Sequence, residues 1–227
     1  MPEINPVIAT LRQHDTPTVW NALTRLRGHS TQGLTIGPIA ASDSAMRMVG
    51  YAATARMTSD APVAMSAEEK DAIRFAYYRM VGAAPAPRIV VMQDIGERRG
   101  LGSIWGEVNA AIHQGLGCAG VVTDGAMRDL DALHGFPILA GSICLGNGFT
   151  QLRDIGGEVE VFGLRVRPGD LIHADRHGAM TIPAEHVAAL PAVIETVLTQ
   201  EKRIIATTRA PGFDAEAMIE AWRKGWR

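Results

Sequence analysis

Two short segments in the middle of the chain carry residue types that could do chemistry. The first is a glycine-bearing loop over 100–109, which contains Glu107 and leads into an expected helix. The second is the run D-G-x-x-R-D over 124–129, which places Arg128 beside Asp129. Backbone N–H groups at a helix N-terminus suit an anionic oxygen, arginine offers a cationic fork, and carboxylates bind hard divalent cations. Together, the two segments predict a site for a divalent metal and a small oxyacid.

The same residues also allow structural interpretations. The Asp-Gly pair at 124–125 is a common turn, and Asp129 could cap a short helix after it, so this run taken alone is more often structural than functional. The loop glycines, with Asp124 about twenty residues further on, are similar to a dinucleotide-binding fingerprint. The third glycine of that fingerprint would have to stand at position 105, however, where the chain has Trp105. The spacing therefore disfavours a dinucleotide site.

Length, composition and charge restrict the class of protein. The chain has 227 residues, of which 47% are hydrophobic and 20% charged, as in a globular protein that buries a core. With 22 Lys and Arg against 24 Asp and Glu, the net charge is −2, and no basic block exists to follow a phosphate backbone. The sequence shows no apolar run of membrane-spanning length and no secretory signal over residues 1–15. We therefore expect a cytoplasmic protein without nucleic-acid or membrane partners.

Cysteines and histidines do not suggest a metal site of their own. Cys118 and Cys144 form neither a C-x-x-C pair nor a zinc-type spacing with a histidine, which indicates reduced thiols. His173 and His177 are four residues apart, but they flank a predicted turn instead of sharing a helix face. This placement disfavours zinc.

Strands and helices alternate around the two segments. Helices are expected from a cap at Asp15 or Thr16 to about Arg27, and after an S-x-x-E capping box at Ser66. Strands are expected over 48–57, where a glycine interrupts the strand, and over 89–92, 120–123, 159–162, 164–166, 171–174 and 179–182. Further helices are expected over about 107–113, just after 129, over about 184–208 with a break at Pro191, and over about 214–223. This order predicts a single α/β domain over 1–227, with C-terminal helices over about 184–227 and ligand-binding residues at strand ends.

The two segments and their surroundings resemble the RraA-like family. This family includes RNase E activity regulators and 4-hydroxy-4-methyl-2-oxoglutarate/4-carboxy-4-hydroxy-2-oxoadipate aldolases. The resemblance is carried by W-G-E-V-N-A-A at 105–111 and by the block G-C-A-G-V-V-T-D-G-A-M-R-D at 117–129. Further matching landmarks lie in the same order at 15–23, 48–54 and 167–183, so the resemblance extends over about residues 15–205.

The resemblance implies a β/β/α swivelling-type fold with flanking helices. It also implies a homotrimer or homohexamer whose active site lies at a subunit boundary and binds Mg²⁺ or Mn²⁺. By position, Asp129 would be the direct metal ligand, and Glu107 would act through a water on the metal. Arg128 would lie near the keto oxygen of the substrate.

The remaining site residues also follow from the resemblance. The backbone N–H groups of Gly106, Glu107, Val108 and Asn109 would hold the substrate carboxylate. A glutamate from the C-terminal region of a neighbouring subunit would complete the site, with Glu201 as the nearest match and Glu195 as its rival. Two apolar residues are more usual at 108–109, so Asn109 is expected to alter the pocket. The helix over 68–80, with Arg74, Tyr77, Tyr78 and Arg79, either faces this pocket or only covers the sheet.

The implied reaction is metal-dependent cleavage of a 4-hydroxy-2-oxo acid, such as 4-hydroxy-4-methyl-2-oxoglutarate, to pyruvate through an enolate. Oxaloacetate decarboxylation would form the same enolate. Neither segment contains a lysine, so a Schiff-base aldolase has no evident nucleophile. The alternative is a non-enzymatic regulator of the RNase E type that acts by binding a protein. The complete carboxylate set favours the enzyme.

Overall fold

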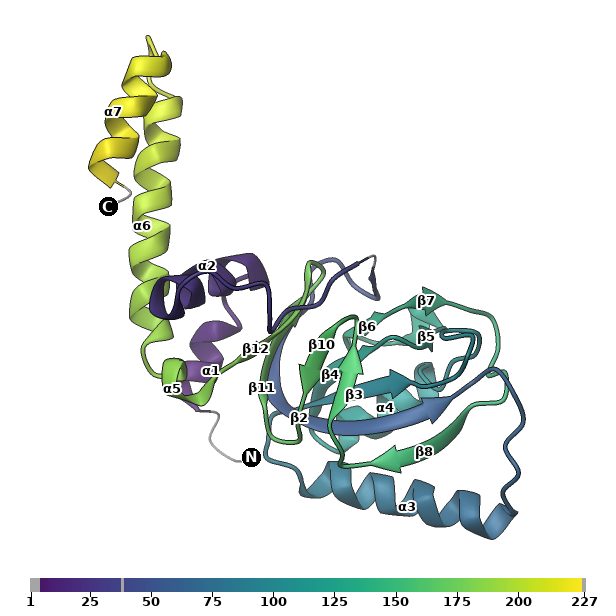
Figure 1. Cartoon of the computed structure of the whole chain (residues 1–227). Coiled ribbons are helices and arrows are strands. Elements are labelled where there is room, and N and C mark those ends of the chain that lie inside the picture. Colours follow the sequence, from purple (N-terminus) through teal and green to yellow (C-terminus); the bar gives the residue numbers. More distant parts are fainter. Residues whose placement is uncertain (1–4, 38, 226–227) are drawn as a thin grey trace.

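The computed structural model describes residues 5–37 and 39–225 and shows a mixed α/β fold on a curled eight-stranded sheet (Figure 1). The strands run in the order β1-β6-β4-β3-β2-β11-β12, and β8 pairs with the second half of β2. Their bounds are β1 (Ala40–Ala41), β2 (Arg47–Thr58), β3 (Arg88–Asp94), β4 (Cys118–Thr123), β6 (Ile138–Ala140), β8 (Gln151–Ile155), β11 (Leu171–Asp175) and β12 (Gly178–Ile182). The central strands β2, β3, β4 and β6 are parallel.

The central strands are apolar because both faces of the sheet are covered. Along β3, Val90 and Met92 face the helices α3 (Ala67–Ala83) and α4 (Glu107–Gly115). Ile89 and Val91 face the opposite side, against a ribbon made of β9 (Val159–Val161) and β10 (Leu164–Val166). Successive side chains of a strand point to opposite faces, so an unbroken apolar run fits a strand between two layers. The layers are therefore ribbon, sheet and helices, which confirms the expected β/β/α arrangement.

A third cluster of buried residues lies at the β11–β12 end of the sheet. There, α1 (Pro6–Leu11) and α2 (Thr16–Arg27) pack with α5 (Ala184–Val187) and the start of α6 (Leu190–Thr208). The second half of α6 and α7 (Ala215–Gly225) form a helical hairpin that extends away from the sheet (Figure 1). Within the described ranges, no helix has both the length and the apolar character that crossing a bilayer requires.

Local sequence signals account for the helix ends that position the layers. The Asp15 carboxylate accepts a hydrogen bond from Thr18 N at 2.9 Å, and α2 ends before Gly28, whose φ is 86°. Ser66 and Glu69 form a reciprocal capping box at the start of α3. Both predicted starts are confirmed, because side chains near each helix end satisfy its free N–H groups.

Some local expectations were wrong. β2 continues through Gly50, where a Cβ would lie 2.6 Å from the Pro87 carbonyl oxygen, so glycine permits close strand pairing and does not interrupt the strand. The short helix expected after Asp129 is present as a 3-10 helix, η1 (Leu130–Ala132). Sequence patterns did not predict α1, β1, β6, β8 or a small pair formed by β5 (Ala126–Met127) and β7 (Ser142–Ile143). The missed strands have at most five residues and no strong periodic pattern of their own.

Candidate active site at the carboxyl ends of β3 and β4

Buried hydrogen bonds join the loops that leave β3 and β4. Asp94 N donates to Asp124 Oδ1 at 2.6 Å, and the Arg99 guanidinium donates to Asp124 Oδ2 at 2.9 Å. Burial raises the pKa of Asp124 to about 6, against the opposing effects of those hydrogen-bonding partners. The Asp94 carboxylate in turn accepts from Ser59 Oγ and from Gly100 N, both at 2.9 Å. These bonds hold the 95–104 loop against residues 124–125, so Asp124 has a structural role here.

The glycine-bearing loop lies directly against the D-G-x-x-R-D run. Trp105 and Met127 form an isolated parallel bridge, and Arg128 N donates to the Trp105 carbonyl oxygen at 2.9 Å. Ser103 Oγ, itself buried, donates to the Ala126 carbonyl oxygen at 2.7 Å. The structure thus brings together the two segments that sequence reasoning singled out.

Asp129 has an unusual backbone conformation and an exposed carboxylate. Its φ of 56° and ψ of 40° lie in the left-handed region, which costs energy for a residue other than glycine. Asp129 occupies the position before η1, yet its side chain makes no capping hydrogen bond there. Instead, Asp129 Oδ2 accepts from Glu107 N at 3.2 Å, and 39% of the side chain is exposed. The capping interpretation was therefore wrong, and the carboxylate faces the start of α4.

Gly106 is required by the close approach of this carboxylate. A Cβ at position 106 would lie 2.3 Å from Asp129 Oδ2 and 3.2 Å from Arg128 Nε. The backbone of Gly106 is extended, with φ of −152°, so any residue could adopt it. The space occupied by the Asp129 and Arg128 side chains therefore explains the glycine here.

Arg128 supplies a cation beside the carboxylate. Its Nε lies 3.7 Å from Asp129 Oδ2, which is an ion-pair distance but too long for a hydrogen bond. That Nε is buried and has no hydrogen-bond partner among the described residues. Because Nε itself is enclosed, the part of Arg128 available to an anionic oxygen is the rest of its side chain, which is 33% exposed and lines a cavity.

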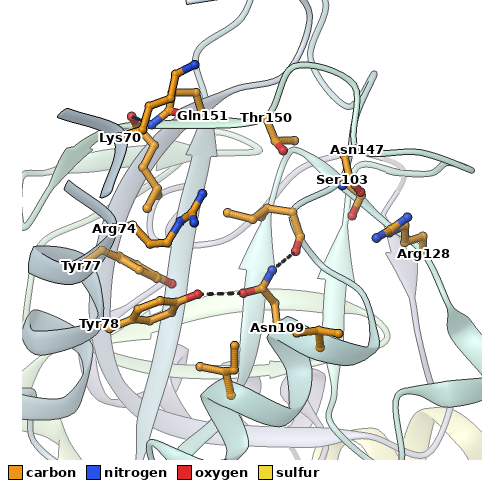
Figure 2. A pocket seen from close by; sticks show the side chains of 14 residues that line it. Lys70, Arg74, Tyr77, Tyr78, Ser103, Asn109, Arg128, Asn147, Thr150 and Gln151 are labelled. Carbon is orange, nitrogen blue, oxygen red and sulfur yellow. Dashed lines mark hydrogen bonds between the residues drawn. The ribbon is translucent and has the colours of Figure 1, made fainter. Parts of the chain in front are cut away.

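A cavity of about 270 Å³ opens beside Arg128 (Figure 2). Its lining residues come from α3, the 103–112 segment, Arg128 and the 147–152 segment, namely Lys70, Arg74, Tyr77, Tyr78, Ser103, Ile104, Val108, Asn109, Ile112, Arg128, Asn147, Thr150, Gln151 and Leu152. Asn109 stands between the two sides of the cavity in Figure 2, where it accepts from Tyr78 OH at 3.2 Å and donates to the Ile104 carbonyl oxygen at 2.7 Å. The volume suits a small molecule.

The buried side chain of His113 contacts two residues that line the cavity, Asn109 and Tyr77. His113 Nδ1 lies 2.6 Å from the Asn109 carbonyl oxygen, and Nε2 lies 2.7 Å from Tyr77 OH. Because a carbonyl oxygen can only accept, Nδ1 carries the proton and Nε2 accepts from the tyrosine. Burial lowers the pKa of His113 to about 4, so the ring is neutral near pH 7. Trp105 packs edge-on against the same ring.

Most of the expected site residues come together in one chain, and the C-terminal glutamates do not. Gly106, Glu107, Val108 and Asn109 begin α4 beside Arg128 and Asp129, as described above. Glu201 and Glu195 lie on α6, on the other side of the molecule from α4 (Figure 1). The Glu201 side chain accepts from Asn21 at 3.5 Å. Their assignment to a site shared between subunits stays a prediction.

The oxygen donors at this edge suit a hard cation. Asp129 and Glu107 both have exposed side chains, and Glu107 N donates to Asp129 Oδ2. Across the described residues, no group of three or more His, Cys, Asp or Glu side chains could hold a metal. Mg²⁺ is commonly bound by one or two carboxylates and keeps several waters, so two carboxylates fit this ion without a full protein cage.

His173 and His177 do not form a zinc pair in the structure. His173 is buried and contacts Thr16 Oγ1 and the Leu11 carbonyl oxygen, whereas His177 Nδ1 lies 3.0 Å from the Asp175 carboxylate. These separate partners agree with the expectation from their spacing.

Sequence reasoning missed part of the cavity wall. Tyr77 both packs in the core and lines the cavity, so the two alternatives for this helix were not exclusive. Lys70 and the 147–152 segment were not singled out, because neither belongs to a motif. The S-x-x-E box located α3 in the sequence, but only the packing of α3 beside β8 shows which of its turns reach the cavity.

Two curated relatives match parts of this chain. An uncharacterized protein of Methanocaldococcus jannaschii is 32% identical over 111 residues, which is 48% of this chain and 52% of that protein. A putative 4-hydroxy-4-methyl-2-oxoglutarate aldolase of Halalkalibacterium halodurans is 36% identical over 84 residues, which is 36% of this chain and 40% of that protein. The matches therefore span about half or less of the length of these relatives.

The fold is shared with solved structures. Streptomyces coelicolor RraAS2, described as an unusual member of the RNase ES inhibitor RraA protein family, superposes with a TM-score of 0.67. The match covers 92% of this chain and 99% of that one at 18% identity, which is a likeness of fold alone. The RraA-like family, described as Aldolase/RraA, matches residues 16–181, which include the sheet, both site segments and the cavity wall. The chain belongs to the RraA-like family.

Proposed function

We propose that this protein is a divalent-metal-dependent carbon–carbon lyase. Its substrate is a 4-hydroxy-2-oxo acid of the 4-hydroxy-4-methyl-2-oxoglutarate type, which it cleaves to pyruvate, and oxaloacetate decarboxylation is a second activity of the same site. The observation that carries the proposal is that Asp129 lies beside Arg128 and the first residue of α4, and that Arg128, Val108 and Asn109 line one cavity. The aldolase name of the Halalkalibacterium halodurans relative supports the reaction class.

The substrate carboxylate is held at the start of α4. The first turn of a helix leaves N–H groups without intrahelical partners, and these groups favour an anion. Glu107 N donates to Asp129, so Val108 and Asn109 are the proposed donors to the substrate. Val108 and Asn109 both line the cavity, which gives the substrate access to them.

Arg128 and the carboxylates act on the reacting atoms. When bound at Asp129, Mg²⁺ or Mn²⁺ supplies a Lewis acid that withdraws charge from the 2-oxo group. The bond between C3 and C4 breaks as the 4-hydroxyl gives its proton to a water molecule and becomes a carbonyl, and the electron pair of the broken bond passes to the enolate of pyruvate. Arg128, whose side chain lines the cavity, stabilises the enolate oxygen through its guanidinium group. Protonation at C3 then releases pyruvate.

We propose that Glu107 and a neighbouring subunit complete the carboxylate set. Glu107 is exposed next to Asp129 and orients water at the site. Glu201, or its rival Glu195, reaches the site from α6 of another copy in a homotrimer or homohexamer. The hairpin of α6 and α7 extends from the body in the manner such an arrangement requires (Figure 1).

A second candidate is a regulator of the RNase E type that acts by protein binding. The description of RraAS2 as a member of an RNase inhibitor family favours this alternative. A regulator has no need of a cavity lined by an arginine that stands beside an exposed carboxylate, so the enzyme is the better explanation of the site.

The test is pyruvate release by the purified protein. We expect pyruvate from oxaloacetate and from 4-hydroxy-4-methyl-2-oxoglutarate when Mg²⁺ or Mn²⁺ is present, and none after chelation. Adding the metal back should restore both reactions. The absence of pyruvate under every one of these conditions would refute the enzyme and favour the regulator.

A further inference from the structure

The side of the cavity opposite Arg128 carries two more cations. Lys70 and Arg74 stand four residues apart on α3, so they share one face of this helix. Both line the cavity, and Figure 2 shows them across it from Arg128, with Asn109 between Arg74 and Arg128. Three cationic side chains therefore line the described cavity, whose lining contains no carboxylate.

These two cations are weakly neutralised by the protein. Arg74 has an ion pair with Asp71 at 3.6 Å, in which more than half of each side chain is exposed, so the pair is weak. Lys70 forms no ion pair with any residue that the structure describes. Surplus positive charge in a concave site concentrates anions.

Hydrogen bonds hold Tyr78 and Asn109 in place between the two cationic sides of the cavity. Tyr78 OH donates to Asn109 Oδ1, and Asn109 Nδ2 donates to the Ile104 carbonyl oxygen (Figure 2). Burial raises the pKa of Tyr78, and the charge of Arg74 acts in the opposite direction, which places this guanidinium close to the tyrosine. A ligand that reaches from Arg128 to Arg74 must therefore pass over a rigid amide and hydroxyl pair.

We propose that Arg74 and Lys70 form a second anion subsite that determines specificity, by binding a carboxylate on the half of the 2-oxo acid that departs. The inference rests on the proposed function, because it assumes that Arg128 and the start of α4 hold the pyruvate half. With about 270 Å³ of space, the cavity suits a small dianion that spans both ends. Substrates with an uncharged departing half leave the subsite unused.

Binding of two 2-oxo acids tests the subsite without turnover. The probes are 2-oxoglutarate and 2-oxopentanoate, which have equal carbon counts and differ by a carboxylate at C5, and neither has a 4-hydroxyl group to support cleavage. By isothermal titration with Mn²⁺ present, we expect 2-oxoglutarate to bind about tenfold more tightly, as for a partly exposed hydrogen bond between charged groups. The double substitution Lys70→Gln and Arg74→Gln should remove this preference.

A matched control lies on the same helix. Arg79 is exposed on α3 and does not line the cavity, so Arg79→Gln removes one positive charge from the same helix and should keep the preference. Arg74→Lys retains the charge and should keep part of it. Circular dichroism and thermal melts establish that each variant is folded.

Turnover gives a second and separate readout. We expect the double variant to raise KM for 4-hydroxy-4-methyl-2-oxoglutarate about tenfold, with little change for 4-hydroxy-4-methyl-2-oxopentanoate, which has a methyl group in place of the distal carboxylate. A preference for 2-oxoglutarate without any pyruvate formation would support the subsite and refute the reaction. Pyruvate formation with equal affinity for both probes would refute the subsite alone. If neither probe binds and no pyruvate forms, both proposals are wrong.

Discussion

The two sides of the cavity satisfy their polar atoms in opposite ways. On the α3–α4 side, Tyr77, His113 and Asn109 form a chain of hydrogen bonds in which each ring nitrogen of His113 has a partner. On the side that follows β4, Arg128 Nε has no partner and Asp129 keeps its carboxylate exposed on a left-handed backbone. We call the first group the buried wall (Tyr77, His113 and Asn109) and the second the reactive edge (Gly106, Arg128 and Asp129).

The difference predicts that the buried wall contributes mainly to stability and that the reactive edge contributes mainly to turnover. A buried polar network that is fully paired holds its members in one geometry, and it loses stability when one partner is removed. A partly exposed cation whose Nε makes no hydrogen bond to a described residue, beside an exposed carboxylate, is available to a ligand but contributes little to folding. We therefore expect substitutions in the buried wall to lower stability, and substitutions in the reactive edge to lower turnover.

The largest effect is expected for Asp129→Asn. The change keeps the size of the side chain and removes the charge proposed to hold the metal, so metal-dependent pyruvate release should fall by about 100-fold to 1,000-fold. Stability should change little, because the side chain is partly exposed and has one backbone hydrogen bond. Asp131→Asn, an exposed aspartate two residues later, is the control and should leave turnover unchanged. Wild-type turnover of Asp129→Asn after chelation and metal restoration would contradict the assignment.

The next largest effect is expected in the pH dependence of the free energy of unfolding, through His113 in the buried wall. Burial lowers the pKa of His113 from 6.5 to about 4, so between these values the unfolded chain binds a proton that the native protein does not. The His113 contribution to the free energy of unfolding is thus present above pH 6.5 and is lost as the pH falls, by up to about 3 kcal/mol at pH 4.

The measurement is denaturant unfolding between pH 4 and 7 for the wild type and for His113→Gln. The raised pKa of Asp124 gives a contribution of opposite sign, which is lost as the pH rises through about 6. Both proteins share it, so it cancels in the difference between their profiles. Parallel profiles would show that His113 is not a neutral buried group.

A methyl group at position 106 should displace the Asp129 carboxylate of the reactive edge. In Gly106→Ala, the new Cβ would lie 2.3 Å from Asp129 Oδ2, so the carboxylate must move. Displacing a proposed metal ligand should lower pyruvate release by about 100-fold, as small misplacements at active sites do. Gly115→Ala, in the last turn of α4 with no atom within 4 Å of its Cβ, is the matched control. Equal turnover of the two variants would mean that the carboxylate position is unimportant.

The smallest effect is expected for Tyr77→Phe in the buried wall. The change leaves the buried acceptor His113 Nε2 without its partner and should lower the free energy of unfolding by about 1–3 kcal/mol. Tyr78→Phe removes a hydroxyl from a partly buried site and should cost less. Denaturant titration measures both. If Tyr77→Phe lowered turnover and left stability unchanged, the distinction between wall and edge would be wrong.

Local patterns predicted the parts of the fold that depend on neighbours in sequence. The caps at Asp15 and Ser66 and the apolar runs of β3 and β4 are confirmed, because a cap or a buried run is decided within a few residues. The strands β6 and β8 were missed. Their pairing with β4 and β2 depends on distant segments, and each is short.

In the candidate site, too, some features follow from the sequence and others depend on tertiary packing. The chemical character of Glu107, Arg128 and Asp129 follows from residue type and from the match of their segments to a family. The need for glycine at position 106 does not follow from the sequence. Only the packed structure shows that the Asp129 carboxylate occupies the space that a side chain at this position would need. The Asp129 side chain does not cap the helix that follows it, because its Oδ2 accepts a hydrogen bond from Glu107 N at the start of α4 instead. That contact also depends on the packed structure.

The sequence by itself determined where helices begin, which runs are buried and which residues carry charge. Those properties depend on local geometry and on residue chemistry. Only the tertiary structure decided that Lys70 and Arg74 face the cavity that Arg128 lines, and that His113 supports it from behind. Contacts between α3, α4 and the end of β4 join residues that are far apart in the chain. No spacing rule encodes them, because they depend on how the layers pack.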